Sequence, residues 1–438
     1  MKLILGKNKV PRLIFITSFF LLFSQHIRAQ FLMDMMDTSK AMGKNMLGIY
    51  QKFNFINISG YIQPQFQVIS EKGAHTYAGP DFPPDVNNRF TIRRGRIKFD
   101  YAHFNKDEIV SFQFAFQFDG SERGVFVRDM WGRVFENKWE VLALAAGVFA
   151  RPFGYEVNLS SGDRESPERG RMSQILMKTE RDIGAMVSFE PRMQTNKYNW
   201  LKVDAGFFNG QGLTGPGEYD SYKDFITRAA VKPLSIMPGV KISGGLSLLA
   251  GGFMQGGQYI YTMEGKGSGS GFVVDSSTTN IGGKVPRKYA GADIQWEFRH
   301  PKSKTVLRAE YWQGIQTALA NSSETPATLV TVPLFTRNFN GAFFYLLHQM
   351  GIHQLGLKFD WYDPNTKVKG NEISSVSGNF HSADIKYSTL GFGYLNYLND
   401  NLKLVLWYDL VKNESTQLDG YTQDLPDNVL TIRLQFKF

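Results

Sequence analysis

The sequence of 438 residues contains no cysteine, which excludes a disulfide scaffold, a thiolate metal site and a cysteine nucleophile. Long apolar runs are absent after residue 23, and the mean hydropathy of −0.26 excludes a protein built from many helical membrane spans. Charged residues are only 20% of the chain, but aromatic residues reach 14%, so a disordered chain is also excluded. A soluble all-β protein or a membrane barrel remains, because polar and apolar residues alternate in a barrel and cancel in the average.

Catalytic motifs are equally scarce. The seven histidines form no HExxH motif, and there is no GxSxG elbow. A GxGxG run lies in the glycine-rich segment 251–271, but it opens no helix and follows no Rossmann-type unit. We therefore expect a protein that is not an enzyme and that binds no metal or cofactor.

The first 29 residues have the three parts of a secretory signal. A basic start precedes the apolar run 13–23, and Ala29 offers a small residue for cleavage. The run is shorter than the ~20 residues of a spanning helix, which argues against an uncleaved anchor. The signal holds five of the 49 basic residues and none of the 40 acidic ones, so its removal lowers the net charge from +9 to +4. The next segment, 30–53, is rich in methionine, and its spacing favours a short periplasmic helix over a functional plug.

Alternation of apolar and polar residues marks the rest of the chain. In the last ten residues, one face carries Leu430, Ile432, Leu434, Phe436 and Phe438, and the other face is polar. This period of two is that of a strand with one apolar and one wet face. Many such segments, with charge confined to the wet faces, favour a membrane barrel over a soluble sandwich, because lipid meets the outer face and water the inner one.

Sixteen candidate strands follow from this pattern, and their lengths suit tilted strands that cross a bilayer. The alternation leaves the phase of 125–135 and 225–234 open. The candidates lie near 54–70, 89–104, 109–119, 125–136, 140–151, 182–190, 200–209, 224–233, 239–250, 287–299, 304–315, 339–349, 352–362, 384–397, 401–412 and 428–438.

The links between these strands alternate in length. Links after even-numbered strands are mostly short and links after odd-numbered strands are mostly long, with 119–124 as the exception. Short turns on one rim and long loops on the other are typical of an outer-membrane barrel, with the short turns on the periplasmic side. We therefore predict an all-β fold in which residues 54–438 form a transmembrane antiparallel β-barrel of about 16 strands in the bacterial outer membrane.

Several short motifs stand out along the chain, and those between residues 89 and 190 are the most specific. They are RFTIRRGRIK at 89–98, GVFARPFG at 147–154, Glu168–Arg169, RDIG at 181–184 and YAGAD at 289–293, with a closing aromatic at Phe438. In these residues the chain resembles the phosphate-selective porin O/P family, in the form common in Bacteroidetes-like bacteria. The resemblance implies a sixteen-stranded barrel, usually trimeric, with loops folded into the lumen and basic residues along the pore.

Arg94, Arg96 and Lys98 lie two residues apart on one candidate strand. If Ile97 faces lipid, the three side chains form one column in the lumen, with neighbours about 7 Å apart. An oxyanion could then pass from one guanidinium to the next, since arginine binds phosphate-like groups bidentately. The alternative is an ordinary polar wall whose arginines pair with Asp and Glu across the barrel.

The long link 152–181 is the candidate constriction. It follows a Pro-Phe-Gly turn and is mixed in charge, so acid–base pairs could hold it against the arginine-lined wall. A loop on the surface is the alternative. The candidate anion contacts in and beside this loop are Arg151, Arg169 and Arg171, and the candidate constriction acids are Glu165 and Glu168.

The chain ends in an aromatic residue. Phe438, with Phe436 on the same face, resembles the terminal signal that the barrel-assembly machinery reads. An ordinary aromatic residue on an edge strand is the alternative.

Together these features predict a passive porin that admits small solutes and favours anions such as phosphate or polyphosphate. The expected partners are outer-membrane lipid, small anionic solutes, the barrel-assembly machinery and other copies of the chain in a homotrimer. We expect no nucleic-acid partner, because the basic strand lies inside an exported barrel. The competing hypothesis is a non-transporting barrel that acts as an enzyme, an adhesin or an assembly partner.

Overall fold

The computed structural model describes residues 55–438 except 107–108, 214, 216, 266–269 and 377. The expected signal of residues 1–29 and the expected helical segment 30–53 lie outside the described residues. Within the described part, none of the helices has the length and apolar character needed to cross a membrane.

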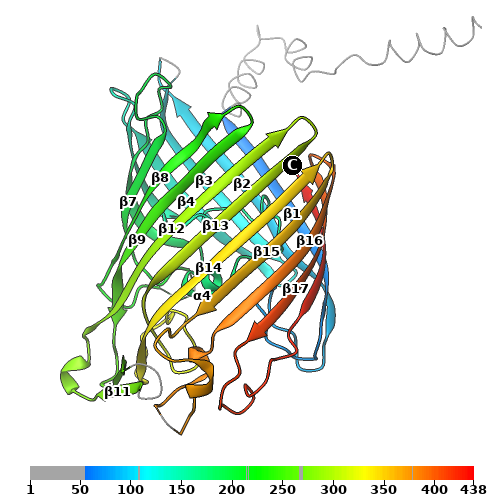
Figure 1. Cartoon of the computed structure of the whole chain (residues 1–438). Coiled ribbons are helices and arrows are strands. Elements are labelled where there is room, and N and C mark those ends of the chain that lie inside the picture. Colours follow the sequence, from blue (N-terminus) through cyan, green and yellow to red (C-terminus); the bar gives the residue numbers. More distant parts are fainter. Residues whose placement is uncertain (1–54, 107–108, 214, 216, 266–269, 377) are drawn as a thin grey trace, which may run out of the picture. The chain divides into compact units, whose positions relative to one another are not determined.

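The described residues fold mainly as strands (Figure 1). The strands are β1 Ile56–Ile69, β2 Asn88–Phe104, β3 Val110–Ser121, β4 Gly124–Phe135, β5 Leu142–Ala150, β6 Arg181–Phe189, β7 Leu201–Phe208, β8 Asp224–Met237, β9 Val240–Met254, β10 Ile260–Glu264, β11 Gly271–Asp275, β12 Lys284–His300, β13 Ser303–Ala318, β14 Leu334–Met350, β15 His353–Asp363, β16 Tyr387–Asn399, β17 Leu402–Asn413 and β18 Val429–Lys437. The helical segments are α4 Arg171–Leu176 and the short 3-10 turns η2 Thr278–Asn280, η3 Gly370–Glu372 and η4 Ser382–Asp384.

Sixteen of these strands close into one antiparallel barrel. The sheet has eighteen strands, but β9 pairs directly with β12, and the hairpin β10–β11 belongs to the link between them. The circle closes where β1 pairs antiparallel with β18, with Ile62 opposite Phe436. Closure satisfies every ladder edge, which a spanning sheet requires because lipid offers no hydrogen-bond partner. The predicted all-β antiparallel barrel is therefore confirmed.

All sixteen predicted strands correspond to barrel strands in the same order. The largest differences lie on the long-loop rim, where β14 begins at Leu334 instead of residue 339 and β9 runs to Met254 instead of residue 250, and on the short-turn rim, where β8 runs to Met237 instead of residue 233. Here the ladder continues beyond the part of each strand that alternates strictly. Alternation is needed only where lipid and water face opposite sides of the sheet, so the sequence pattern ends before the hydrogen bonding does.

Both strands whose phase the sequence left open contain β-bulges. In β4 the register shifts between Val127 and Asp129, and in β8 it shifts between Val231 and Leu234. A bulge inserts an extra residue on one strand and so breaks the period of two. The ambiguity in the pattern therefore had a structural cause.

The links sort by rim as predicted. The turns 238–239, 301–302, 351–352 and 400–401 lie on one rim, and Figure 1 places the C-terminus on this same rim and the long loops with β11 at the other. The link 190–200 is longer than the other turns of its rim, and the short turn 122–123 is the predicted exception on the long-loop rim.

The outer face of the barrel is apolar. Phe112, Phe114 and Phe116 of β3 are each more than a third exposed, and Leu434 and Phe436 of β18 are similarly exposed. A contiguous apolar surface of this kind is unfavourable in water and matches the hydrocarbon region of a bilayer. The chain is thus a bacterial outer-membrane β-barrel.

Part of the interior near the short-turn rim is filled by apolar side chains from β13 to β17. Its largest member, Trp407 of β17, is 1% exposed and lies across the inner face of β16. A Cβ at Gly393 would come within 2.0 Å of the Trp407 ring, and one at Gly391 within 2.8 Å. The missing side chains on β16 are what allow the indole to lie flat against the backbone.

We expect the substitution Gly393→Val to destabilise the barrel, because the valine forces Trp407 out of its position, at a cost of about 1–3 kcal/mol for overpacking. The measurement is the temperature at which the folded, fast-migrating band disappears in gel electrophoresis. Gly132→Val is the matched control, since a Cβ at Gly132 meets nothing within 4 Å. Equal melting of both variants and the parent would contradict this account of β16.

Candidate functional site

The loop of residues 151–180 enters the lumen. Ser161 Oγ is 2.6 Å from Tyr61 OH on β1, while the Gly154 amide donates to Ser247 Oγ on β9 over 3.0 Å. Because β1 and β9 lie on opposite walls of the barrel, the loop crosses the interior. This position excludes the alternative in which the loop lies on the surface.

The loop begins with a fixed turn over β13. Gly154 has a φ of 66°, and a Cβ there would lie 2.0 Å from Glu310 Oε1, so only glycine fits. The Glu310 carboxylate accepts hydrogen bonds from the amides of Tyr155 (3.0 Å) and Glu156 (2.9 Å) and from Trp312 Nε1 (2.6 Å). The Pro-Phe-Gly turn therefore places the start of the loop against the buried Glu310 carboxylate, which binds the two backbone amides that follow the turn.

Two charged residues hold the single turn of helix α4. The Glu156 carboxylate accepts from the Gly170 amide at 2.9 Å and from Ser173 Oγ at 2.6 Å. At the other end, Arg169 donates to the carbonyls of Ser173 (2.8 Å) and Met177 (3.1 Å). Burial lowers the pKa of Arg169 to about 10. The sequence suggested Arg169 as an anion contact. In the structure its guanidinium instead binds backbone carbonyls at the C-terminal end of α4.

Glu168 is the main electrostatic anchor of the loop. Its carboxylate receives Arg93 Nε at 2.8 Å, Arg94 Nη2 at 2.6 Å and Arg433 Nη2 at 3.1 Å, from β2 and β18. Burial alone would raise the pKa of Glu168, but the three guanidiniums outweigh it and hold the pKa well below 4.5. The carboxylate therefore stays ionised at neutral pH and ties the loop to the wall. We call Glu168 with its three arginines the loop seat.

The predicted column on β2 faces inward, but its members have different environments. Arg94 is enclosed in the loop seat, whereas Arg96 pairs with Asp119 at 2.8 Å and also donates to Tyr61 OH at 2.6 Å. Lys98 is a third exposed and pairs with Asp100 at 2.7 Å. These residues do pair with acids, but the acids lie on the loop, on the neighbouring strand β3 and on β2 itself, not across the barrel as the alternative expected. Arg96 and Lys98 also border the open lumen.

The remaining predicted residues lie inside the loop packing. Arg151 is buried, which lowers its pKa, and it donates to the Thr179 carbonyl. The Arg171 guanidinium lies 3.7 Å from the centre of the Tyr387 ring, a cation–π contact. Glu165 pairs with Arg308 of β13 at 2.6 Å. The structure thus places Arg151 and Arg171 away from the open lumen.

Between the loop and the inward residues of β5 and β7 to β15 lies an apolar core. Phe153 and Met177 of the loop are fully buried against inward residues of the wall, among them Phe208 and Trp312. The ring centres of Phe153 and Trp312 are 4.7 Å apart in an edge-on arrangement. The lumen therefore contains an apolar core as well as water-lined surface, which the alternating strand pattern did not indicate.

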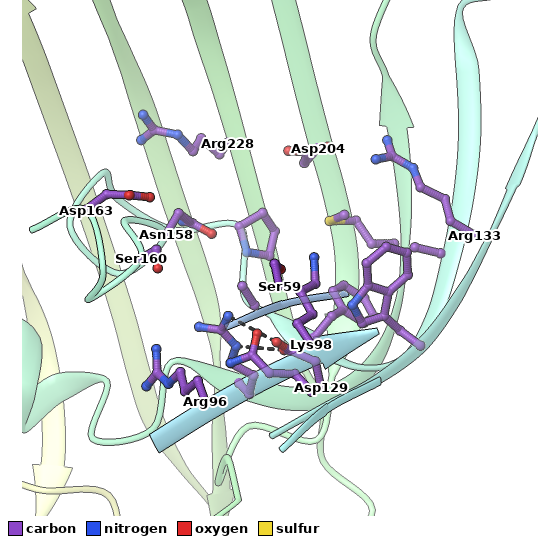
Figure 2. Close-up of a pocket in the computed structure, with 18 of the residues that line it drawn as sticks. Ser59, Arg96, Lys98, Asp129, Arg133, Asn158, Ser160, Asp163, Asp204 and Arg228 are labelled. Atoms are coloured by element: carbon purple, nitrogen blue, oxygen red, sulfur yellow. Dashed lines mark hydrogen bonds and ion pairs between the residues drawn. The ribbon is translucent and has the colours of Figure 1, made fainter. Parts of the chain in front are cut away.

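A cavity of about 560 Å³ lies on the other side of the loop, and we call it the vestibule. Ser59 near the start of β1 and Lys437 near the end of β18 border it, so it lies toward the short-turn rim. Figure 2 shows Asp163 of the loop on one side of this space and Arg133 of β4 on the other. Seven basic residues line it, against three acidic ones. The basic residues are Arg96, Lys98, Arg133, Arg181, Lys202, Arg228 and Lys437, and the acidic residues are Asp129, Asp163 and Asp204.

Five of these basic residues were not among the anion contacts predicted from the sequence. Lys202 and Arg228 lie at inward positions of β7 and β8, where a lumen-facing charge is ordinary. Arg133 follows the bulge in β4, so its face could not be read from alternation. Their convergence depends on which strands face each other across the closed barrel, and a single strand pattern does not contain that information.

No family model and no curated protein matches the chain. Solved structures do match it. An anion-selective porin from Comamonas acidovorans has 10% identity and a TM-score of 0.49, covering 87% of this chain and 99% of that chain. The outer membrane channel DcaP of Acinetobacter baumannii has 11% identity and a TM-score of 0.48, covering 87% and 97%. A loop-deletion mutant of OmpT, an outer membrane protein of Vibrio cholerae, has 9% identity and a TM-score of 0.46, covering 87% and 99%. At these identities, none of them transfers a function to this chain.

We expect Glu168→Gln to release the loop, because removing one partner from a buried ionic cluster costs about 3–5 kcal/mol. The readout is trypsin cleavage within residues 151–180 of the folded barrel in detergent. Glu324→Gln is the control, since it removes the partner of the exposed Lys178, a pair worth about 0–1 kcal/mol. A loop that stays as resistant in Glu168→Gln as in the control would show that the loop seat does not hold it.

Proposed function

We propose that this barrel is a porin: a passive channel through the outer membrane for small hydrophilic solutes, with a preference for anions such as phosphate or polyphosphate. The observation that carries the proposal is the vestibule, an aqueous space inside a lipid-facing barrel whose lining has more than twice as many cations as carboxylates. A pore selects by its width and by the charges at its lining, and excess cations raise the local anion concentration.

The strength of the anion preference depends on carboxylates that pair with the basic residues of the vestibule. Glu190 lies 3.7 Å from Arg133 and 3.5 Å from Lys202, and Asp100 lies 2.7 Å from Lys98. These acids cancel part of the field that the lysines and arginines create. We therefore propose a modest anion preference, with the guanidiniums of Arg96 and Arg133 as the groups that fit oxyanions.

Assembly and export are part of the same proposal. We propose that the chain is exported with residues 1–29 as its signal, that the barrel-assembly machinery reads the terminal Phe438 and Phe436, and that the barrel forms a homotrimer in the lipid bilayer. Phe436 and Phe438 are both exposed on the outer face, where such machinery could bind them. The Phe438 carbonyl accepts the Gly60 amide at 3.1 Å, so the terminus also completes the closing ladder.

A second function is favoured by one observation. An apolar core lies in the lumen between the loop and the wall, as expected of a barrel that does not transport. Such a barrel would be an adhesin, an assembly partner or an enzyme. Ohmic current from the purified protein in a planar bilayer discriminates between the two, because only the porin conducts.

For the porin, we expect a reversal potential that indicates anion preference in a salt gradient. Replacing Lys98 and Lys202 by Gln should lower the anion-to-cation permeability ratio by about twofold per charge. One unit charge about 8 Å from a permeating ion in water contributes about 0.5 kcal/mol, which salt screening reduces to about 0.2 kcal/mol, with opposite sign for the anion and the cation. Lys302→Gln, in the short turn 301–302, is the control and should leave the ratio unchanged. Cation preference in the parent protein would contradict the anion claim.

A further inference from the structure

The outer face of β12 to β15 contains an apolar groove of about 320 Å³. The groove lies over Ala309 of β13, which is paired with Phe344 of β14. Its other walls include Trp296 of β12 and Phe359 of β15, and the three aromatic residues are each more than a third exposed. The hollow exists because one small side chain lies among large ones. In an outer-membrane barrel this face meets hydrocarbon, so an apolar chain and not water fills the groove.

A second hollow of about 360 Å³ lies at the short-turn rim of the same strands, and we call it the rim pocket. Figure 1 shows β12 to β15 side by side in the wall. Arg299 pairs with Glu297 at 2.5 Å, whereas Lys302 and Lys304 have no ion-pair partner among the described residues. None of the residues that line the rim pocket is acidic; they are Arg299, His300, Lys302, Ser303, Lys304, Gln349 and Gly351.

Strand β13 connects the two hollows along the outer face. Its even-numbered residues point inward, as the burial of Val306 in the apolar interior shows, so its odd-numbered residues point outward. Ser303 borders the rim pocket, and Leu307 and Ala309 border the groove. Successive outward residues on a strand are about 7 Å apart, so the row from Ser303 to Ala309 is about 20 Å long. A single extended molecule can therefore reach from one hollow to the other.

The middle of this row marks the edge of the hydrocarbon. Thr305 Oγ1 lies 2.9 Å from His348 Nδ1 of β14, and both side chains belong to the outer face. Polar groups on this face are costly in hydrocarbon and fit the headgroup level. With a strand tilt of about 40°, 20 Å along β13 corresponds to about 15 Å of depth, which is half of the ~30 Å hydrocarbon core. The rim pocket and the groove thus belong to one leaflet.

From this arrangement we propose that the outer face of β12 to β15 binds one anionic phospholipid of the periplasmic leaflet. The phosphate lies in the rim pocket at Lys302 and Lys304, and one acyl chain follows β13 into the groove over Ala309. Charge complementarity favours a lipid over a second copy of the chain, because the lipid brings the negative charge that the two lysines lack. The proposal requires a barrel in the membrane and does not depend on conduction.

The first test titrates the purified barrel in detergent with phosphatidylglycerol or phosphatidylcholine and counts bound lipids by native mass spectrometry. The first phosphatidylglycerol should bind at least fivefold more tightly than the first phosphatidylcholine. Lys302→Gln with Lys304→Gln should remove this difference, because each basic residue near a phosphate contributes about fivefold. The matched control is Lys106→Gln with Lys138→Gln, two exposed lysines in other turns of the same rim, and it should keep the difference.

Filling the groove tests the acyl-chain half of the site. Ala309→Phe should weaken the binding of the first phosphatidylglycerol at least fivefold, because the ring occupies the hollow. Ala146→Phe is the control, since Ala146 is an exposed alanine of β5. Both variants are compared as the folded, fast-migrating band, so a loss of folding is not read as a loss of binding.

Fluorescence locates the bound lipid. Bromine atoms on an acyl chain quench a nearby indole, and Trp296 forms one wall of the groove. A small fraction of brominated phosphatidylglycerol in phosphatidylcholine nanodiscs should quench the parent protein more than Trp296→Phe. Brominated phosphatidylcholine at the same fraction should quench both proteins equally, and so should brominated phosphatidylglycerol when the two lysines are replaced.

Three results would overturn the proposal. The first is equal affinity of the parent protein for the two lipids, or unchanged affinity in both the lysine variant and Ala309→Phe. The second is displacement of the bound phosphatidylglycerol by inorganic phosphate, which would show a phosphate pocket without a lipid site. The third is a change of oligomeric state in Ala309→Phe but not in Ala146→Phe, which would show that this face contacts a second copy of the chain.

Discussion

The constraint behind the whole structure is that lipid cannot hydrogen-bond to a backbone. The sheet must close, and with sixteen strands it closes around a space wider than side chains alone can fill. This protein fills that space with a segment of its own chain. The loop 151–180 is held at several walls by buried charges, and its apolar residues pack against aromatic side chains that the wall turns inward. The lumen is therefore divided into a packed apolar region and the vestibule.

Buried ion pairs suit this task better than apolar contacts alone would. A buried charge is costly unless it is paired in good geometry, so each pair accepts only one loop position. Glu168 shows this, because its carboxylate is the common partner of three guanidiniums from two strands that join only when the barrel is closed. At the vestibule, the pair Lys98–Asp100 is more exposed, with 34% of the Lys98 side chain accessible.

Alternation predicted the strands, their order, the sorting of the links and the inward face of Arg94, Arg96 and Lys98, because each of these depends on residues close in sequence. It could not predict that Arg94 is enclosed by Glu168, 74 residues away, while Lys98 borders water. The bulge beside Arg128 was also hidden, since an inserted residue only makes a period of two look irregular. The local sequence pattern determines which face of the sheet a side chain lies on. Closure of the barrel and the path of the loop determine which charges on the inner face are enclosed and which border the cavity.

The division of the lumen is tested most directly by hydroxyl-radical labelling of the parent barrel in lipid nanodiscs, followed by mass spectrometry. Trp131 and Met186 line the vestibule, whereas Trp312 and Met177 are fully buried against the loop. We expect oxidation of Trp131 and Met186 and protection of Trp312 and Met177. Comparable oxidation of all four residues, or protection of the vestibule pair, would contradict a lumen with one hydrated and one dry side.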